Sequence, residues 1–256
     1  LEENIERLNE AAKLFLVENM GATAIGTGIN SEPEYAEICA RELRIISGEE
    51  FVLAPNLIAA TPDTGACVTY SSELKRFCVQ LSKVCNDLRL LSSGPRCGLN
   101  EINLPPMQPG SSIMPGKVNP TQNEALTMIA AQVMGNDVAI SVGGANGQFE
   151  LNVFKPMIIY NFLHSARLIG DGCRSFNDNC VIGIEPVKEN IKKHLDDSLM
   201  LVTALNPKIG YYKAASIAQK AYRENKSLKQ AAVESGLLTA EDFDNWVDPS
   251  KMVGNI

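Results

Sequence analysis

Residues 121–142 are apolar on nearly every face when they are read as a helix. A helix of this kind must be covered on all sides, which proteins achieve by packing long helices together. Helical patterns also cover four other segments, 1–19, 33–46 (with a stop at Gly48), 56–91 (continuous or broken near Pro62) and 150–176. Strand-like alternation is almost absent, so the chain is predicted to be all-α, a bundle of long helices. Because one copy cannot cover such apolar helices, we also expect a homo-oligomer.

The helical patterns in the sequence become shorter after about residue 180. Starts of short helices are predicted at Pro186, Ser227 and Thr239. Gln230 and Asp242 stand three residues after the last two starts, which is the spacing of a capping box. We therefore predict two domains. Residues 1–180 form the bundle, which includes an irregular loop over 92–120, and residues 181–256 form a small helical domain.

The loop over residues 92–120 contains six prolines and four glycines between two long helical patterns. An irregular segment of this length inside a compact domain is usually either functional or disordered. Disorder fits poorly, because the segment has apolar residues that could anchor it, namely Ile102, Leu104, Met107, Ile113, Met114 and Val118. We therefore predict an ordered loop with a functional site at its polar tip, and expect its glycines to let it move as a lid.

The tip carries Ser111, Ser112, Lys117 and Asn119. Lys117 supplies a positive charge and Asn119 an amide, and backbone N–H groups at the flanking glycines can turn toward an anion. This set suits a dicarboxylate, or a carboxylate on which further charge develops. A serine can act there as a base only where N–H groups and cations stabilise its alkoxide.

Two other interpretations apply to the same residues. The run GSSIMPGK is close to a phosphate-binding P-loop, but five residues instead of four separate Gly110 from Gly116. In addition, Val118 replaces the serine or threonine of that motif and no strand leads in, so the P-loop is rejected. A plain Gly/Pro connector whose serines cap helices stays an equal alternative on composition alone.

Charge and cysteine usage narrow the class of protein. The net charge of −7 and a pI near 5.0 argue against nucleic-acid or membrane partners. No run is expected to reach transmembrane length, and the first residues form an acidic helical pattern rather than a signal peptide. Seven cysteines without C-x-x-C spacing predict reduced thiols in the cytoplasm, with a mitochondrial location left open, and no metal or other cofactor. Because the chain begins in mid-helix without Met, we expect a fragment.

The run GSSIMPGKVNP at 110–120 resembles the signature loop of the fumarase/aspartase superfamily, and the similarity extends over essentially all of the chain. The chain resembles the C-terminal portion of such an enzyme, with the later helices of the central bundle and the small C-terminal domain. Members are lyases that eliminate a group from a succinyl-type substrate and release fumarate. The resemblance implies a small dicarboxylate substrate and a homotetramer in which three subunits build each active site.

The resemblance also assigns roles to residues of the loop. Ser111 matches the serine base that removes the β-proton of the substrate. Lys117 and Asn119 match the residues that hold the substrate carboxylate, which becomes a dianionic aci-carboxylate in the intermediate. We group Ser112 with these substrate-binding residues.

Glu124 matches a glutamate that pairs with a histidine from another part of the assembly, which makes it a candidate catalytic residue. Thr121-x-x-Glu124 is also a capping box, so from the sequence alone this carboxylate could instead cap the next helix. His164 and His194 match no catalytic position of the superfamily. We predict that both histidines are structural or exposed.

Within the superfamily the sequence is divided. Segments before the loop, such as GATAIGTGIN and CNDLRLLSSGPR, are closer to aspartate ammonia-lyases. Segments after it, such as NPTQNEALTM and GGANGQFELNVFKPM, are closer to class II fumarases, and these matches are denser. We therefore predict a lyase that interconverts L-malate and fumarate. The aspartate ammonia-lyase reaction is the close alternative, and a non-catalytic relative or inactive fragment is the alternative from another class.

Overall fold

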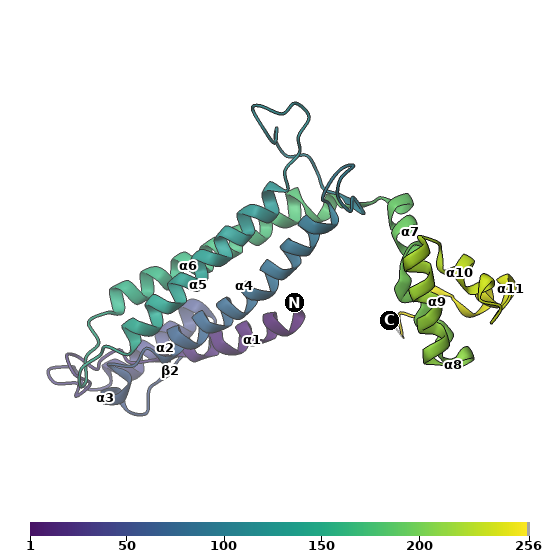
Figure 1. Cartoon of the computed structure of the whole chain (residues 1–256). Coiled ribbons are helices and arrows are strands. Elements are labelled where there is room, and N and C mark those ends of the chain that lie inside the picture. The colour runs from purple at the N-terminus through teal and green to yellow at the C-terminus, as the bar shows by residue number, and fades with distance from the viewer. Residues whose placement is uncertain (255–256) are drawn as a thin grey trace. The chain divides into compact units, whose positions relative to one another are not determined.

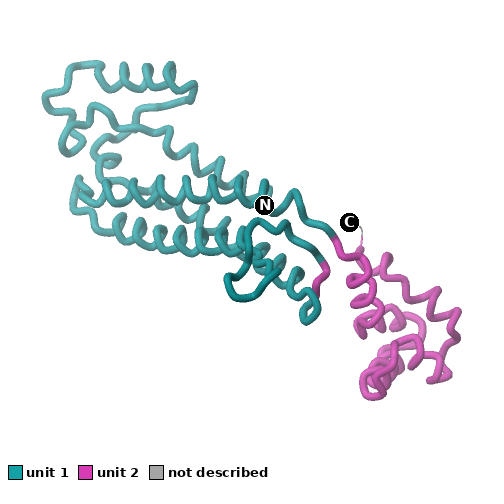
Figure 2. The backbone as a smooth tube through the Cα atoms, turned by 90° about the horizontal axis from the view of Figure 1, so that it is seen from above, with its two compact units in different colours: residues 1–98, 102–185 teal, residues 99–101, 186–256 magenta. Residues whose placement is uncertain are grey.

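The computed structural model describes residues 1–254, and long helices dominate it (Figure 1). The all-α class predicted from the sequence is confirmed. The chain divides into two compact units, which Figure 2 shows in different colours. Unit 1 comprises residues 1–98 and 102–185, and unit 2 comprises residues 99–101 together with the chain from Pro186 onward.

Unit 1 is built around three long helices that run side by side, α4, α5 and α6, with α1 packed against α4 (Figure 1). Its elements up to the loop are α1 (Glu2–Ala12), the 3-10 helix η1 (Lys13–Leu16), β1 (Val17–Glu18), α2 (Tyr35–Ser47), β2 (Val52–Leu53), α3 (Leu57–Ala60) and α4 (Gly65–Leu91). The elements that follow are β3 (Ile102–Asn103), α5 (Thr121–Gly144), α6 (Lys155–Asn179) and the 3-10 helix η2 (Val181–Gly183), after which β4 (Glu185–Pro186) leads out of the unit.

The core of unit 1 forms where apolar stripes of the three long helices meet. On α4 the stripe follows the helical repeat through Leu74, Cys78, Leu81 and Cys85. The other helices contribute Leu126, Ala130 and Val133 from α5, and Ile169, Phe176 and Cys180 from α6 and its C-terminal end. The three helices therefore hold one another along most of their length.

A buried carboxylate fixes the register of α5 against α4. Asp137 is only 2% exposed. Its carboxylate accepts a hydrogen bond from Ser71 Oγ at 2.8 Å and pairs with Lys75 Nζ at 2.5 Å. Because a buried charge is tolerated only when it is paired and hydrogen-bonded, sliding one helix along the other would break both contacts at a large cost.

Helix α5 buries the face toward α4 and α6. Met128 is 67% exposed and Val138 is 61% exposed in the single chain, so the cover that was expected on the other faces does not come from the described residues of this copy. The expectation that no apolar run reaches transmembrane length was wrong, since α5 is long and apolar enough to cross a membrane by length and composition. Core helices of soluble proteins pass the same test.

The first 64 residues differ most from their prediction. In the helix expected over residues 1–19, the α-helix ends at Ala12 and continues as η1 to Leu16, after which the chain forms β1, in which Val17 pairs in parallel with Val52 of β2. Helix α2 begins at Tyr35 instead of Pro33, although its end at Gly48, with φ +75°, is as predicted. The pattern over 56–91 forms two helices, because the break at Pro62 separates α3 from α4.

Unit 2 contains short helices with clear start signals. Its elements are α7 (Lys188–Asp196), η3 (Leu199–Leu205), α8 (Asn206–Ile209), α9 (Tyr211–Glu224), α10 (Leu228–Glu234), α11 (Ala240–Trp246) and η4 (Pro249–Lys251). Both predicted capping boxes are confirmed, Ser227 with Gln230 on α10 and Thr239 with Asp242 on α11. The unit has an apolar core of its own, which includes Leu205, Ile217, Ala221, Leu228, Ala231, Ala232 and Phe243.

Candidate functional site

The loop over 92–120 connects α4 to α5, and most of it extends beyond the end of the bundle (Figure 1). Its tip folds back on itself, because the N–H of Gly110 donates to the carbonyl of Lys117 at 2.8 Å. A Cβ at residue 110 would lie 2.5 Å from that same oxygen, so only glycine fits. Gly116, with φ +76°, supplies the left-handed residue that the return of the chain requires. The tip is therefore a compact turn. We call its base, where Gly110 bonds to Lys117, the neck.

Ser111 stands inside this turn and is partly buried. Its Oγ accepts hydrogen bonds from the backbone N–H groups of Ile113 at 3.1 Å and Met114 at 3.0 Å. Two N–H donors aimed at one oxygen stabilise negative charge on it. The turn thus supplies part of the environment in which a serine alkoxide could act as a base.

Asn119 closes the neck from the other side. Its Nδ2 donates to the carbonyl of Gly110 at 2.7 Å, which leaves its second amide hydrogen and its amide oxygen for another partner. Lys117 and Ser112 are exposed on the same turn. The four predicted residues of the tip therefore share one short backbone unit, and a carboxylate that binds there would meet a cation and an amide.

Glu124 lies in the first turn of α5, where the capping-box alternative can be tested. The N-cap of α5 is Pro120, and within residues 1–254 its side chain makes no capping hydrogen bond at this end of the helix. The capping-box interpretation of Thr121 and Glu124 was therefore wrong: the helix starts one residue too early for Thr121 to be the cap. Instead, the Glu124 carboxylate lies 3.8 Å from the guanidinium of Arg89 on α4, and both side chains are about 40% exposed.

The apolar residues of the loop divide into two groups. Leu104 packs against the core of unit 1, and Ile102 is partly buried in β3. Ile113 is 85% exposed, and Met107, Met114 and Val118 are also exposed. Within residues 1–254, Leu104 at the base of the loop is therefore anchored by apolar contacts, whereas backbone hydrogen bonds hold the tip.

Comparisons with known proteins place this loop in a family. The family model described as "Lyase" matches residues 1–135, and the model described as "Fumarase C C-terminus" matches residues 201–254. The chain belongs to the fumarase/aspartase superfamily of lyases. A class II fumarate hydratase from Neisseria meningitidis is 56% identical over 253 residues, which cover 99% of this chain and 55% of that protein. One from Ralstonia nicotianae is 57% identical over 92% of this chain and 51% of that protein.

Solved structures of the superfamily have the same fold. A fumarate lyase:delta crystallin from Brucella melitensis superposes with a TM-score of 0.93 at 46% identity, over 99% of this chain and 55% of that one. A class II fumarase from Schistosoma mansoni gives a TM-score of 0.91 at 39% identity, over 99% and 56%. The chain therefore spans about half the length of the superfamily members that it matches, and it corresponds to their C-terminal portion.

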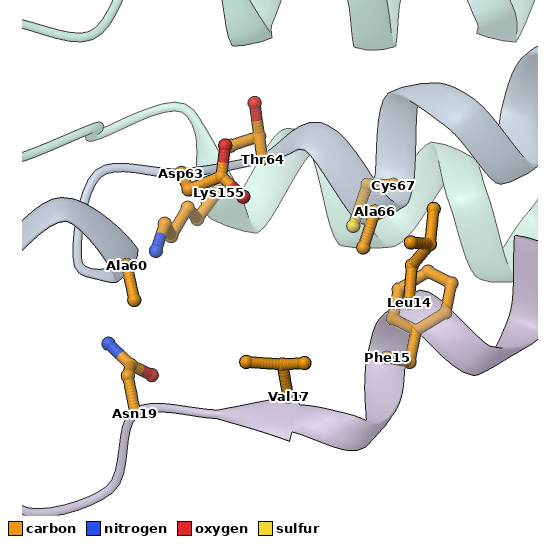
Figure 3. Close-up of a pocket in the computed structure, with 10 residues that line it drawn as sticks. All are labelled: Leu14, Phe15, Val17, Asn19, Ala60, Asp63, Thr64, Ala66, Cys67 and Lys155. Carbon is orange, nitrogen blue, oxygen red and sulfur yellow. The ribbon is translucent and has the colours of Figure 1, made fainter. Parts of the chain in front are cut away.

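A separate cavity lies near the start of α4, and Figure 3 shows its lining. Its volume is about 230 Å³, and Asn19, Asp63, Thr64, Cys67 and Lys155 contribute the polar and sulfur groups. Lys155 Nζ already donates to the carbonyl of Thr61. Burial raises the pKa of the Cys67 thiol, while Lys155 opposes the rise, so this thiol is not activated. Because α4 has 27 residues and is therefore about 40 Å long, this cavity is remote from the loop.

Sequence reasoning missed several polar partners of the loop region. Arg89 beside Glu124 is one of them, and the pair of Glu101 with His194 is another. These partners come from other elements of the fold, so no local spacing in the sequence indicates them. His164 lies on α6 and stacks on Tyr160, four residues earlier on the same helix, with ring centres 5.9 Å apart.

Proposed function

We propose that this chain supplies the base-bearing loop of a lyase that converts L-malate to fumarate and water, and the reverse. The observation that carries the proposal is the donation of two backbone N–H groups to Ser111 Oγ. These two donors are part of what a serine base requires, and they occur in a chain that is 56% identical to a class II fumarate hydratase, which supports the proposal.

In the proposed mechanism, Ser111 as an alkoxide takes the proton from the substrate carbon next to one carboxylate. The electron pair of that C–H bond moves toward the carboxylate carbon and forms the dianionic aci-carboxylate. The pair then returns to form the double bond of fumarate, and the C–O bond to the hydroxyl group breaks. The hydroxyl group leaves as water by taking a proton from a general acid that the amino-terminal half would supply, and Ser111 gives the abstracted proton to solvent to become an alkoxide again. In the reverse direction each step runs backward with the same groups.

Lys117 and Asn119 hold the carboxylate on which the charge grows. The ammonium of Lys117 gains attraction as the carboxylate becomes dianionic, so it stabilises the intermediate more than the substrate. Asn119 has an amide hydrogen left after its bond to Gly110, and the neighbouring Ser112 hydroxyl can donate as well. Glu124 would pair with a histidine from another segment, and its weak contact with exposed Arg89 leaves it free to do so.

We also propose that the protein is a homotetramer with active sites built by three subunits. Large apolar side chains are exposed on both α5 (Met128 and Val138) and α6 (Tyr160 and Leu163), and exposed apolar surface of this kind favours cover by a partner. A second copy and the amino-terminal half of the relatives are both available to cover it. A monomer in sedimentation of the full-length protein would contradict this assembly. A cytoplasmic location fits the seven free thiols.

The reaction is tested by fumarate absorbance in the full-length protein, that is, this chain joined to the amino-terminal half that its relatives possess. We expect turnover with L-malate and none with L-aspartate. Activity with L-aspartate alone would replace the proposal with the aspartate ammonia-lyase reaction, and activity with neither would favour a non-catalytic relative. The 256-residue chain by itself is expected to be inactive because it lacks the partner segments, and measurable turnover by it would contradict the shared site.

A further inference from the structure

The start of the serine-bearing loop is held by unit 2. Residues 99–101 group with unit 2, whereas the loop before and after them groups with unit 1. The backbone that leads to Ser111 therefore passes through the C-terminal unit on its way to the tip. Within unit 2, these residues lie against α7, the first helix of that unit.

Three hydrogen bonds connect α7 to two consecutive residues of the loop. The N–H of Val187, the N-cap residue of α7, donates to the carbonyl of Glu101 at 2.8 Å. Asn190 Nδ2 donates to the carbonyl of Asn100 at 2.8 Å. His194 Nδ1 lies 2.7 Å from Glu101 Oε1. An ionised carboxylate only accepts hydrogen bonds, so Nδ1 of His194 carries the hydrogen.

The two side-chain contacts come from one face of α7. Positions 190 and 194 are four residues apart and are therefore neighbours on the helix surface, while the backbone N–H of Val187 makes its contact at the start of the helix. Asn100 has φ +46°, a left-handed conformation that asparagine tolerates better than most residues and that turns its carbonyl toward α7. The side chains of His194 and Glu101 are 37% and 23% exposed, so water screens their contact only in part.

We propose that Asn190 and His194 are positioning residues for the proposed reaction: by holding Asn100 and Glu101 they restrict where the loop that carries Ser111 can lie. The inference rests on the proposed function. Both residues act through the backbone of the loop in this proposal, not through contact with the substrate. Because the base and the carboxylate-binding groups share one loop, releasing its start lowers the fraction of molecules in the competent arrangement. A smaller competent fraction weakens apparent binding in proportion, so KM rises more than kcat falls.

The test compares three variants of the full-length protein. His194→Leu removes the donor to Glu101, His194→Asn keeps a donor near the position of Nδ1, and Lys192→Met is the matched control. Lys192 lies on the same helix but forms an exposed pair with Asp196, away from the loop. We expect kcat/KM to fall about fivefold to tenfold in His194→Leu, mainly through KM, as the loss of one partly buried hydrogen bond predicts. His194→Asn should recover most of the loss, and Lys192→Met should match the wild type.

Hydrogen exchange of the loop gives a readout that does not depend on activity. Peptides from residues 102–118 should exchange faster in His194→Leu than in the wild type, while peptides from α4 and α5 stay unchanged. Glu101→Gln provides a second route to the same weakened contact if His194→Leu folds poorly. Unchanged loop exchange in both variants would overturn the inference, and so would faster exchange with unchanged kinetics. If the wild type itself forms no fumarate, the proposed function fails, while the exchange measurement still judges the contact.

Discussion

The side-chain amide of Asn119 donates to the carbonyl of Gly110 at 2.7 Å, so a proposed substrate-binding residue is bonded to the residue that precedes the proposed base. The N–H of Gly110 in turn donates to the carbonyl of Lys117. The base and both carboxylate-binding groups are therefore fixed to one another through a single glycine. Their relative positions are set by backbone geometry and do not depend on packing against a core.

This arrangement makes Gly110→Ala a sharp test of the neck. The new Cβ would lie 2.5 Å from the Lys117 carbonyl, so the neck has to open and the three groups separate. We expect kcat/KM to fall by about 100-fold, the size of effect that a displacement of about 1 Å produces. The melting temperature should hardly change, because the tip is exposed.

Gly116→Asn is the matched control for that substitution. Residue 116 has φ +76°, which asparagine tolerates, and among residues 1–254 no atom beyond the adjoining residues lies within 4 Å of the place that a Cβ would occupy there. The loss should stay below about tenfold. Equal losses in the two variants would show that any side chain in the turn is harmful and that the neck has no special role.

Prediction from the sequence succeeded where the signal is local. Gly48 as a helix end and the Ser227 and Thr239 capping boxes depend on residues within one turn of each other, and all three are confirmed. The pairing of Val17 with Val52 was missed, because contacts between distant segments leave no periodic pattern in such short strands.

The same distinction holds for the site. The tip residues were found because they form one contiguous motif that resembles a known family. Arg89 beside Glu124 and His194 beside Glu101 come from other helices, and only the fold brings them there. The two hydrogen bonds to Ser111 Oγ are local. Serine makes the same bonds in many ordinary turns, so the composition of the loop does not indicate that this serine is a base.

The buried carboxylate between α4 and α5 is expected to matter for stability. Asp137→Ala leaves Ser71 and Lys75 without their partner and should lower the free energy of unfolding by about 3 kcal/mol in urea titrations of the chain. In a double-mutant cycle, adding Lys75→Met should cost little more, because the two residues act as one unit. Lys192→Met, which breaks an exposed pair, should change stability by less than about 0.5 kcal/mol. Additive losses for Asp137 and Lys75 would contradict the pairing.

The buried thiols of α4 predict a loss of stability at alkaline pH. Burial, with a smaller contribution from Cys173, raises the pKa of Cys78 from 9.0 to about 12. Between pH 9 and pH 12 the unfolded thiol therefore releases its proton while the folded one keeps it, so stability is full below pH 9 and decreases as the pH rises.

Urea unfolding at about pH 8 and about pH 10, on either side of the ordinary thiol pKa, measures this effect. The free energy of unfolding should fall more steeply with pH in the wild type than in Cys78→Ala, which has no thiol to ionise there. Cys97→Ala is the control, because Cys97 is exposed. If the free energy of unfolding fell equally with pH in the wild type and in Cys78→Ala, burial of this thiol would not be the cause of the loss of stability at alkaline pH.

The most direct test of the central claim is the kcat of Ser111→Ala in the full-length protein, with L-malate as substrate. We expect kcat to fall by at least about 1,000-fold, because the substitution removes the base while the helices that carry the stability stay intact. Ser216→Ala, on α9 in unit 2, is the control and should be fully active. Hydrogen exchange of the loop separates loss of the base from loss of the turn that Ser111 Oγ supports. A large loss of kcat with an ordered loop is the result that the account predicts, and a kcat within a few-fold of the wild type would contradict it.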